Sequence, residues 1–363
     1  MKYIDEYRDK KIVLLLANEI KKAITKPIRL MEVCGGHTMS IQKYGIPYLL
    51  PEKLELISGP GCPVCVTSRS YVDRAVAYSR LDDVIITTYG DLIRVPGSSS
   101  SLDKEKAKGA DVRIVYSILD ALTIAKKNRR KKVVFLGIGF ETTAPSSAAG
   151  IIKAQMAGLS NFYLYSAHKV MPPAMETLID EGVLIDGYIG PGHVSTITGV
   201  GIYLNIPKKY GLGVVISGFE PVDLMQSILM LVNQIENNDP KVEIEYTRAV
   251  KPEGNIKAQE MLDEVFEYRD DWWRGLGVLK NSGLKIREQY AMHDAEEQII
   301  VDVEPLKEPK GCICGDILRG VSKPKDCKLF GTVCTPSNPV GSCMVSNEGS
   351  CAAYYLYNRL NEK

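Results

Sequence analysis

The chain has 363 residues, of which 45% are hydrophobic and 25% charged, and its formal net charge is +1. These are ordinary globular values, and the length predicts two or three domains. The near-neutral charge gives no indication of a nucleic-acid or anionic membrane partner, and the longest apolar runs, residues 12–17 and 133–140, are too short to cross a bilayer. The N-terminus has acidic residues before a short apolar run and no cleavage site, so we predict a cytoplasmic protein.

Residues 12–24 place their apolar side chains on one helical face, which predicts an amphipathic N-terminal helix. Short β-branched runs then alternate with helical patterns as far as residue 238, a pattern typical of parallel α/β layers joined by right-handed crossovers. The expected strands are residues 30–33, 54–57, 84–88, 112–116, 132–136, 162–165, 186–189 and 213–217.

The turns after these strands recur in similar form. In matching order, CGGHT (34–38) resembles GFETT (139–143), GPGC (59–62) resembles GPGH (190–193), and YGD (89–91) resembles GFE (218–220). Chance is the alternative, because glycine is common at strand ends. We predict two similar Rossmann-like α/β domains with parallel sheets, residues 27–130 and 131–238, whose glycine-rich strand ends face one cleft.

The sequence after residue 239 is less regular, and the segment 312–351 holds six of the nine cysteines among several prolines. Loops of this kind rarely form a core alone, so a metal centre is expected to stabilise them. We predict a C-terminal iron-sulfur domain over residues 239–363, with the N-terminal segment 1–26 packing on it.

An odd number of cysteines in a chain without a secretion signal favours metal or thiol chemistry over a disulfide framework. Four thiolates with wide, irregular spacing suit a [4Fe-4S] cluster better than zinc, which usually has two tight cysteine pairs. Zinc, or no metal, stays open, and spacing alone does not choose between Cys312 and Cys314. The remaining candidate ligands are Cys327, Cys334 and Cys351.

Cys62 and Cys65 lie in a glycine- and proline-rich turn, close enough to form a disulfide or to share a metal. They are a redox pair, or half of a structural zinc site. Cys34 lies between a strand and an expected helix N-terminus, beside His37. This position predicts a thiolate that acts as a soft ligand or a nucleophile, with a buried core cysteine as the alternative.

Four further polar residues, His37, Asp91, Glu141 and His193, lie on the glycine-rich strand ends and are expected to face the cleft. Helix capping or a structural role is the alternative for each of them. Glu348 lies close to a candidate cluster ligand and is expected to relay protons or to stay solvated.

Together, the CGGHT, GPGCPVC, GFETT and PGHVS motifs and the cysteine series resemble the HypD family of [NiFe]-hydrogenase maturation proteins over nearly the whole chain. In that family the cluster ligand is the cysteine before Gly-Asp, which here is Cys314. The resemblance implies a scaffold on which an Fe(CN)2CO centre is built with the chaperone HypC, and with cyanide from HypE and HypF. It also implies that Cys34 holds the iron and that a [4Fe-4S] cluster feeds electrons to the Cys62/Cys65 pair.

Two rival functions remain. One is an iron-sulfur-dependent disulfide reductase that works without a chaperone, and the other is a zinc-stabilised binding module. A radical enzyme that uses S-adenosylmethionine is disfavoured because the chain has no Cys-x3-Cys-x2-Cys motif. We therefore expect a maturation scaffold with redox activity rather than a turnover enzyme.

Overall fold

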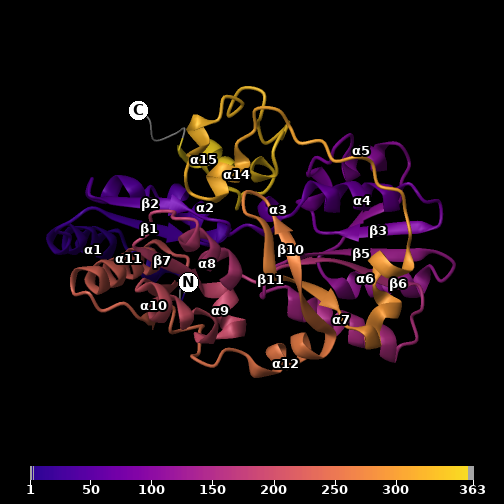
Figure 1. Ribbon diagram of the computed structural model, residues 1–363, viewed down its shortest axis with the longest axis horizontal. Helices are drawn as coiled ribbons and strands as arrows, with labels where there is room; N and C mark the ends of the chain where they lie inside the picture. The colour runs from indigo at the N-terminus through magenta and orange to yellow at the C-terminus, as the bar shows by residue number, and fades with distance from the viewer. Residues whose placement is uncertain (1, 3, 359–363) are drawn as a thin grey trace.

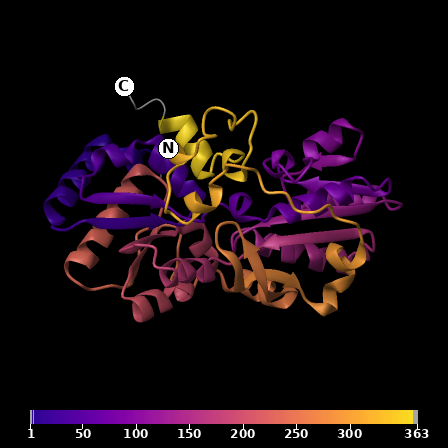
Figure 2. The same ribbon diagram turned by 45° about the horizontal axis from the view of Figure 1, so that its top comes forward.

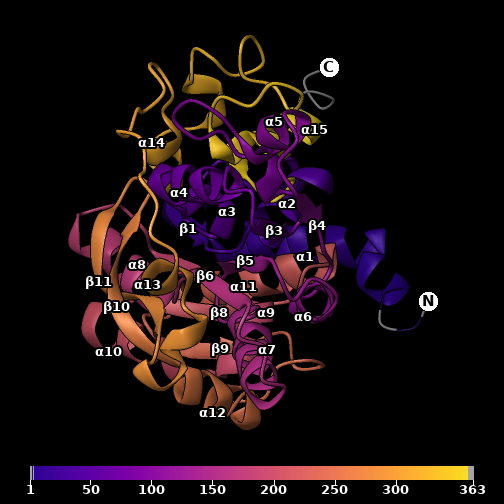
Figure 3. The same ribbon diagram turned by 90° about the vertical axis from the view of Figure 1, so that its right-hand side faces the viewer.

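The computed structural model describes residues 2 and 4–358, and its two parallel β-sheets lie side by side along the long axis (Figure 1). The described part of the chain from residue 310 to 358, called the C-terminal tail below, lies over the junction between the two sheets, as a second view also shows (Figure 2). From the side, this tail lies above helices α3 (Pro63–Val66) and α4 (Arg69–Ser79), whereas helix α12 (Ile256–Val265) lies at the opposite end of the molecule (Figure 3). No helix in the described part of the chain is long and apolar enough to span a bilayer.

Sheet A has five parallel strands in the order β2-β1-β7-β8-β9. One of its faces is covered by helices α1 and α11, whose apolar side chains pack with the strands in one core that includes Ile20, Leu30 and Ile228. The strands are β1 (Ile28–Glu32), β2 (Leu54–Ser58), β7 (Gly187–Pro191), β8 (Gly213–Ser217) and β9 (Val242–Ile244), and the helices are α1 (Lys10–Ala23) and α11 (Pro221–Glu236).

Sheet B has four parallel strands in the order β4-β3-β5-β6. Helices α6 and α7 bury one face around Phe135, and a capping box between Ser117 and Asp120 fixes the start of α6. The elements are β3 (Val84–Thr88), β4 (Val112–Ile114), β5 (Lys132–Gly139), β6 (Phe162–His168), α4 (Arg69–Ser79), α5 (Leu102–Ala107), α6 (Ile118–Lys127) and α7 (Ala144–Met156).

The two-sheet α/β architecture is confirmed, and every strand predicted from the sequence is present. The predicted boundary between residues 130 and 131 does not separate the sheets, however. Leu30 of β1 lies opposite Gly187 of β7, so sheet A takes strands from both predicted domains, and β3 pairs with β5 across the boundary. Alternating strands and helices specify a parallel sheet but not which strands are neighbours. The sequence pattern therefore did not show that the chain leaves sheet A after β2 and returns to it at β7.

Two further domain predictions are wrong. The N-terminal helix α1 packs on α11 of sheet A and not on the C-terminal domain, because its buried stripe, which includes Leu16 and Ile20, matches the apolar face of α11. Strand β9, expected to belong to the C-terminal domain, extends sheet A by pairing with β8.

The C-terminal part contains an antiparallel hairpin and a tail that share a core with the sheets. Tail residues Cys314, Cys343 and Ala352 belong to the same buried cluster as Val33 and Cys65, so the tail covers the junction rather than forming a separate core. The elements are α12 (Ile256–Val265), β10 (Phe266–Trp273), β11 (Gly277–Ile286), α13 (Ala295–Gln298), α14 (Cys314–Leu318) and α15 (Ser350–Tyr357). The other described helices are α2 (Gly35–Lys43), α3 (Pro63–Val66), α8 (Pro172–Asp180), α9 (Gly192–Thr198) and α10 (Asn205–Tyr210), with short 3-10 helices at Asp5–Arg8, Ile46–Leu49, Leu92–Arg94, Gly201–Tyr203, Glu288–His293, Pro324–Asp326 and Ser342–Met344.

Candidate functional site

A cleft of about 670 Å³ lies where the carboxyl ends of strands from both sheets meet the tail. Parallel strands present their following turns at one edge, so motifs that are far apart in the sequence converge there. Cys34 and Cys62 line this one cleft as expected, but Cys65, which was expected to line it with them, does not. The cleft-lining residues that carry functional groups include Cys34, Cys62, Asp91, Thr142, Thr143, His193 and Glu348.

Cys34 lies two residues after strand β1, at the N-cap position of helix α2, and the turn at residues 59–62 packs directly on its backbone. The N–H of Gly35 donates to the carbonyl of Gly61 at 3.0 Å. A Cβ atom at Gly61 would lie 2.1 Å from the backbone nitrogen of Cys34, so only glycine fits this approach. The strand end that carries Cys34 and the turn that carries Cys62 are therefore one rigid unit.

The thiol of Cys34 is not poised as a thiolate. Desolvation and then the nearby Glu348 raise its pKa, against the opposing backbone N–H groups of His37 and Gly36, to about 12. The sequence prediction of a thiolate is therefore wrong for the metal-free protein, because burial and a carboxylate outweigh the helix N-terminus. A metal that binds here must displace the thiol proton.

His37 does not assist Cys34 through its ring as the sequence suggested. Its Nε2 lies 3.2 Å from the carbonyl of Ser217, and burial lowers its pKa to about 4, so the imidazole is neutral. The ring stacks on Phe219 at 4.6 Å, and His193 stacks on the same phenyl ring at 3.9 Å. Sequence reasoning missed Phe219, although it lies in a turn already matched to another motif.

The carboxyl groups around Cys34 are divided between the cleft wall and the interior. Asp91 lines the cleft as predicted. Glu348, which the sequence placed only near a candidate cluster ligand, lines it too, and its pKa is raised by desolvation and then by Asp91. Glu141 does not line the cleft but a second cavity, which corrects the sequence prediction. Glu32, which the sequence did not indicate, accepts the backbone N–H of Cys34 at 3.0 Å, and burial raises its pKa to about 8.

The Cys62/Cys65 pair spans the short helix α3. Cys62 lines the cleft and its Sγ accepts the N–H of Cys65 at 3.3 Å, whereas Cys65 is fully buried. The Cys65 thiol interacts with Cys343 on its other side, and Cys343 in turn interacts with Cys314, which together hold the pKa of Cys343 below its ordinary value. Thiols thus follow one another from the cleft to the tail. The sequence had left Cys343 without a role.

The tail cysteines gather around Cys314. Its Sγ lies 3.2 Å from that of Cys312, it interacts with Cys351, and Cys334 faces both the 312/314 pair and Cys351. The Sγ of Cys327 lies 3.8 Å from the carbonyl of Gly311, one residue before Cys312. All these thiols are free. Among the described residues no three metal-binding side chains lie in a single-ion geometry, but an all-sulfur donor set in buried loops fits the chemistry of an iron-sulfur cluster.

Comparison with known proteins decides the family. A family model labelled HypD and described as "Hydrogenase formation hypA family" matches residues 11–358. The chain belongs to the HypD family. It is 48% identical to the hydrogenase maturation factor HypD2 of Bradyrhizobium diazoefficiens over 100% of this chain and 98% of the relative.

Two further HypD-family relatives are similar over comparable lengths. A putative hydrogenase expression/formation protein of Methanocaldococcus jannaschii is 50% identical over 94% of this chain and 98% of its own. The hydrogenase maturation factor HypD of Cupriavidus necator is 47% identical over 100% of this chain and 98% of its own. The resemblance drawn from the sequence motifs is thus confirmed at the level of the family.

In this HypD-family fold, the guanidinium of Arg274 attaches helix α3, which carries Cys65, to the β10–β11 hairpin. Arg274, at the tip of the β10–β11 hairpin, donates from Nε to the carbonyl of Cys65 at 3.0 Å and from a terminal nitrogen to that of Thr67 at 3.1 Å. Ser342 of the tail donates to the same Cys65 carbonyl at 3.1 Å. The hairpin and the tail therefore both hold the peptide that carries Cys65. No local signal in the sequence connects Arg274 with Cys65.

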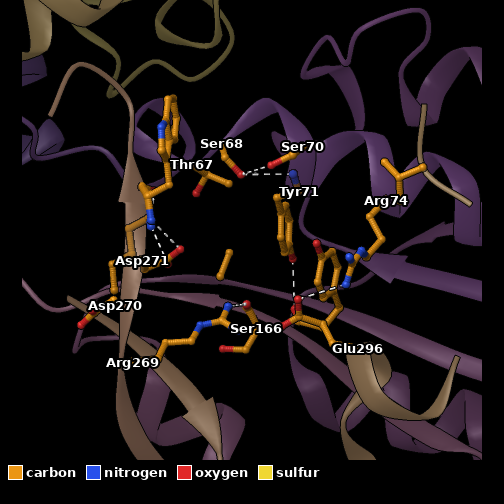
Figure 4. Close-up of a pocket in the computed structure, with 15 residues that line it drawn as sticks. Thr67, Ser68, Ser70, Tyr71, Arg74, Ser166, Arg269, Asp270, Asp271 and Glu296 are labelled. Atoms are coloured by element: carbon orange, nitrogen blue, oxygen red, sulfur yellow. Dashed lines mark hydrogen bonds and ion pairs between the residues drawn. The ribbon is translucent and has the colours of Figure 1, made fainter. Parts of the chain in front are cut away.

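A polar pocket of about 440 Å³ lies next to α3, between helix α4 and the hairpin (Figure 4). Its charges compensate one another: Arg74 and Arg269 both pair with Glu296, at 3.1 and 2.7 Å, and Lys169 pairs with Asp271 at 2.6 Å. Figure 4 shows Arg74 pointing at Glu296 while Arg269 reaches Ser166. Because its cations already have carboxylate partners, we interpret this pocket as an ionic layer that joins the hairpin to sheet B.

Proposed function

We propose that this chain acts in hydrogenase maturation as a scaffold on which the Fe(CN)2CO unit of a [NiFe] enzyme is assembled. The observation that carries the proposal is the position of Cys34 in a cleft shared by both sheets, with Cys62 on the adjoining wall. Family membership supports it, because the relatives carry the names of hydrogenase maturation factors.

Cys34 would hold the iron, which is cargo rather than a resident cofactor. The thiol is protonated in the free protein, so iron binding exchanges the S–H proton for an Fe–S bond and releases that proton. Cyanide and carbon monoxide favour low-spin Fe(II), which a soft thiolate suits. Glu348, with its raised pKa, lies beside Cys34 and can accept the released proton.

The cleft also offers a group that can bind the cyanide ligand. Its wall carries the exposed His193, whose pKa is lowered by desolvation, so that the neutral ring can donate an N–H to a nitrogen of bound cyanide. We propose that the chaperone HypC adds a second thiolate to the iron at the mouth of the cleft, and that HypE, charged by HypF, delivers the cyanide there.

The tail cysteines would hold a [4Fe-4S] cluster through Cys314, Cys327, Cys334 and Cys351, the set that the family resemblance implies. Such a cluster supplies single electrons when bound. The Cys62–Cys65 disulfide takes up two electrons and two protons when it opens to two thiols. Cys343 interacts with Cys65 and Cys314, and this contact supports electron supply from the tail to the pair.

The iron-binding part is tested on the complex with HypC. Replacing Cys34 with alanine is expected to remove the infrared bands of iron-bound cyanide and carbon monoxide while the brown cluster absorbance stays. Replacing Cys62 or Cys65 is expected to leave that absorbance and stop hydrogenase maturation. Infrared bands that persist in the Cys34→Ala protein would exclude this thiol as the iron ligand.

One feature favours a second candidate, a disulfide reductase. Cys62 lines the cleft while Cys65 is buried, which resembles the division between an attacking and a resolving thiol. Reduction of an external disulfide without HypC, at the same rate as with it, would favour the reductase. Dependence on HypC supports the scaffold.

A further inference from the structure

A second cavity, of about 600 Å³, lies on the other side of the GFETT turn from the cleft. Its lining comes from the β10–β11 hairpin, helix α12, the start of helix α8 and residues 198 and 202. Phe140 and Thr142 line the cleft, whereas Glu141 between them lines this cavity. The two spaces therefore share one turn of the chain, and neither the motifs nor the proposed function gives this cavity a role.

Glu141 is the polar group at the inner end of the cavity. Its side chain belongs to a residue that is only 4% exposed. Oε1 accepts the N–H of Met171 at 2.9 Å, but the buried Oε2 has no hydrogen-bond partner among the described residues. A buried carboxylate oxygen without a donor costs free energy that only a hydrogen bond or an opposite charge recovers.

The sequence explains why helix α8 offers Glu141 few hydrogen-bond donors. Helix α8 starts next to Glu141, and a helix N-terminus normally offers free N–H groups to a nearby carboxylate. Here the first two helical positions are Pro172 and Pro173, which have no N–H, so from this helix start only Met171 donates to the carboxyl group. The carboxylate is kept in place but not neutralised, and burial raises its pKa to about 7.

The walls and the rim of the cavity suit a cation on an aliphatic stem. The walls are apolar, with Val170, Leu262 and Leu284 among them. The rim carries the exposed carboxylates of Asp263 and Glu267. One guanidinium, that of Arg287, opposes them, and its Nε donates to the backbone carbonyl of Asp263. Including Glu141, the lining has more carboxyl groups than cations.

We propose that this cavity binds an organic cation, an ammonium or guanidinium group on an aliphatic stem, with Glu141 Oε2 accepting its N–H. The stem packs on the apolar walls, and the rim carboxylates attract the positive charge. A free alkylamine and a lysine or arginine side chain of another protein present the same chemistry. The proposal concerns a separate cavity, so it does not depend on iron assembly in the cleft.

The test is calorimetric titration of the full-length protein with agmatine, n-butylamine and the neutral n-butanol. We expect both amines to bind and n-butanol not to bind. Glu141→Gln keeps the side-chain shape and removes the charge, and is expected to weaken amine binding at least tenfold, since hydrogen bonds to charged groups contribute about 1.5–3 kcal/mol. Glu260→Gln makes the same change on the exposed side of helix α12, outside the cavity, and should bind as the wild type does.

Equal affinity of the Glu141→Gln and wild-type proteins would overturn the proposal, as would n-butanol binding as well as n-butylamine, or no binding of either amine. Blocked lysine and arginine amides separate the two sources of the cation. Tighter binding of the blocked amino acids than of agmatine assigns the cavity to a partner's side chain, and the reverse assigns it to a free amine. Hydrogenase maturation is not a readout here, so failure of the scaffold proposal leaves this result unchanged.

Discussion

Replacing Glu141 with glutamine should make the protein more stable, and increasingly so as the pH rises. The folded protein holds the pKa of Glu141 at about 7, against 4.5 for the ordinary carboxyl. Below pH 4.5 both folded and unfolded chains keep the proton, so the carboxyl adds no pH-dependent cost. Between 4.5 and 7 the unfolded chain releases it while the folded chain retains it, so stability falls as the pH rises.

The size of this effect follows from the same two values. At about 1.4 kcal/mol per pH unit, the interval from 4.5 to 7 corresponds to about 3 kcal/mol of unfolding free energy, which is lost in full above pH 7. Glutamine does not titrate, so the variant lacks this loss. Glu32 and Glu245 also have raised pKa values, but they are present in both proteins and cancel in the difference.

The assay is urea denaturation of both proteins at several pH values from 4.5 to 8, followed by the fluorescence of the buried Trp273. The stability difference between variant and wild type should grow by about 3 kcal/mol over this range. A difference that stays constant with pH, or that changes in the opposite direction, would refute the assignment of an unpaired, desolvated carboxyl. Saturating n-butylamine at pH 8 should reduce the difference, because the cation would compensate the wild-type charge.

Four other substitutions test separate parts of the structure. Asp271→Asn leaves the ammonium of Lys169, whose side chain is 2% exposed, without its charge partner, and should cost about 3–5 kcal/mol in thermal unfolding; a loss below 1 kcal/mol would contradict the buried pair. Cys314→Ala, purified anaerobically, should lose iron and sulfide while Cys312→Ala keeps both; the reverse result would assign the fourth ligand to Cys312. Phe219→Leu should cost about 1 kcal/mol of stability and raise the pKa of the stacked imidazoles in proton NMR; unshifted resonances would argue against the stack.

The local elements of the fold could be predicted because the signals for them are local. Runs such as residues 84–88 are β-branched and end at glycine-rich turns, and they appear as strands with nearly the expected ends. The pairing of Leu30 with Gly187 has no such signal, since the choice of neighbouring strand depends on the packing of the whole sheet. The domain boundary was therefore misplaced even though each strand was found.

In the candidate site, too, some features could be predicted from local sequence signals and others could not. The strand-end turns identified Cys34 and Cys62, because the carboxyl ends of parallel strands meet at one edge. The protonated state of Cys34 depends on desolvation, which a one-dimensional pattern does not carry. Glu141 was assigned to the wrong cavity, because neighbouring side chains of one turn point into different spaces. Arg274 is 209 residues from the Cys65 carbonyl that it contacts, beyond the reach of any motif.

The order of strands has a consequence for synthesis on the ribosome. Sheet B is formed by one uninterrupted stretch, residues 84–168, inserted between the first two strands of sheet A and the strands that complete it. Sheet B can form as soon as residues 84–168 have left the ribosome. Strands β1 and β2 cannot pair with β7 until more than a hundred further residues have been synthesised. The nascent chain thus displays its first three thiols, Cys34, Cys62 and Cys65, on an unfinished sheet, so the cleft takes shape only after the sequence that follows sheet B has been translated.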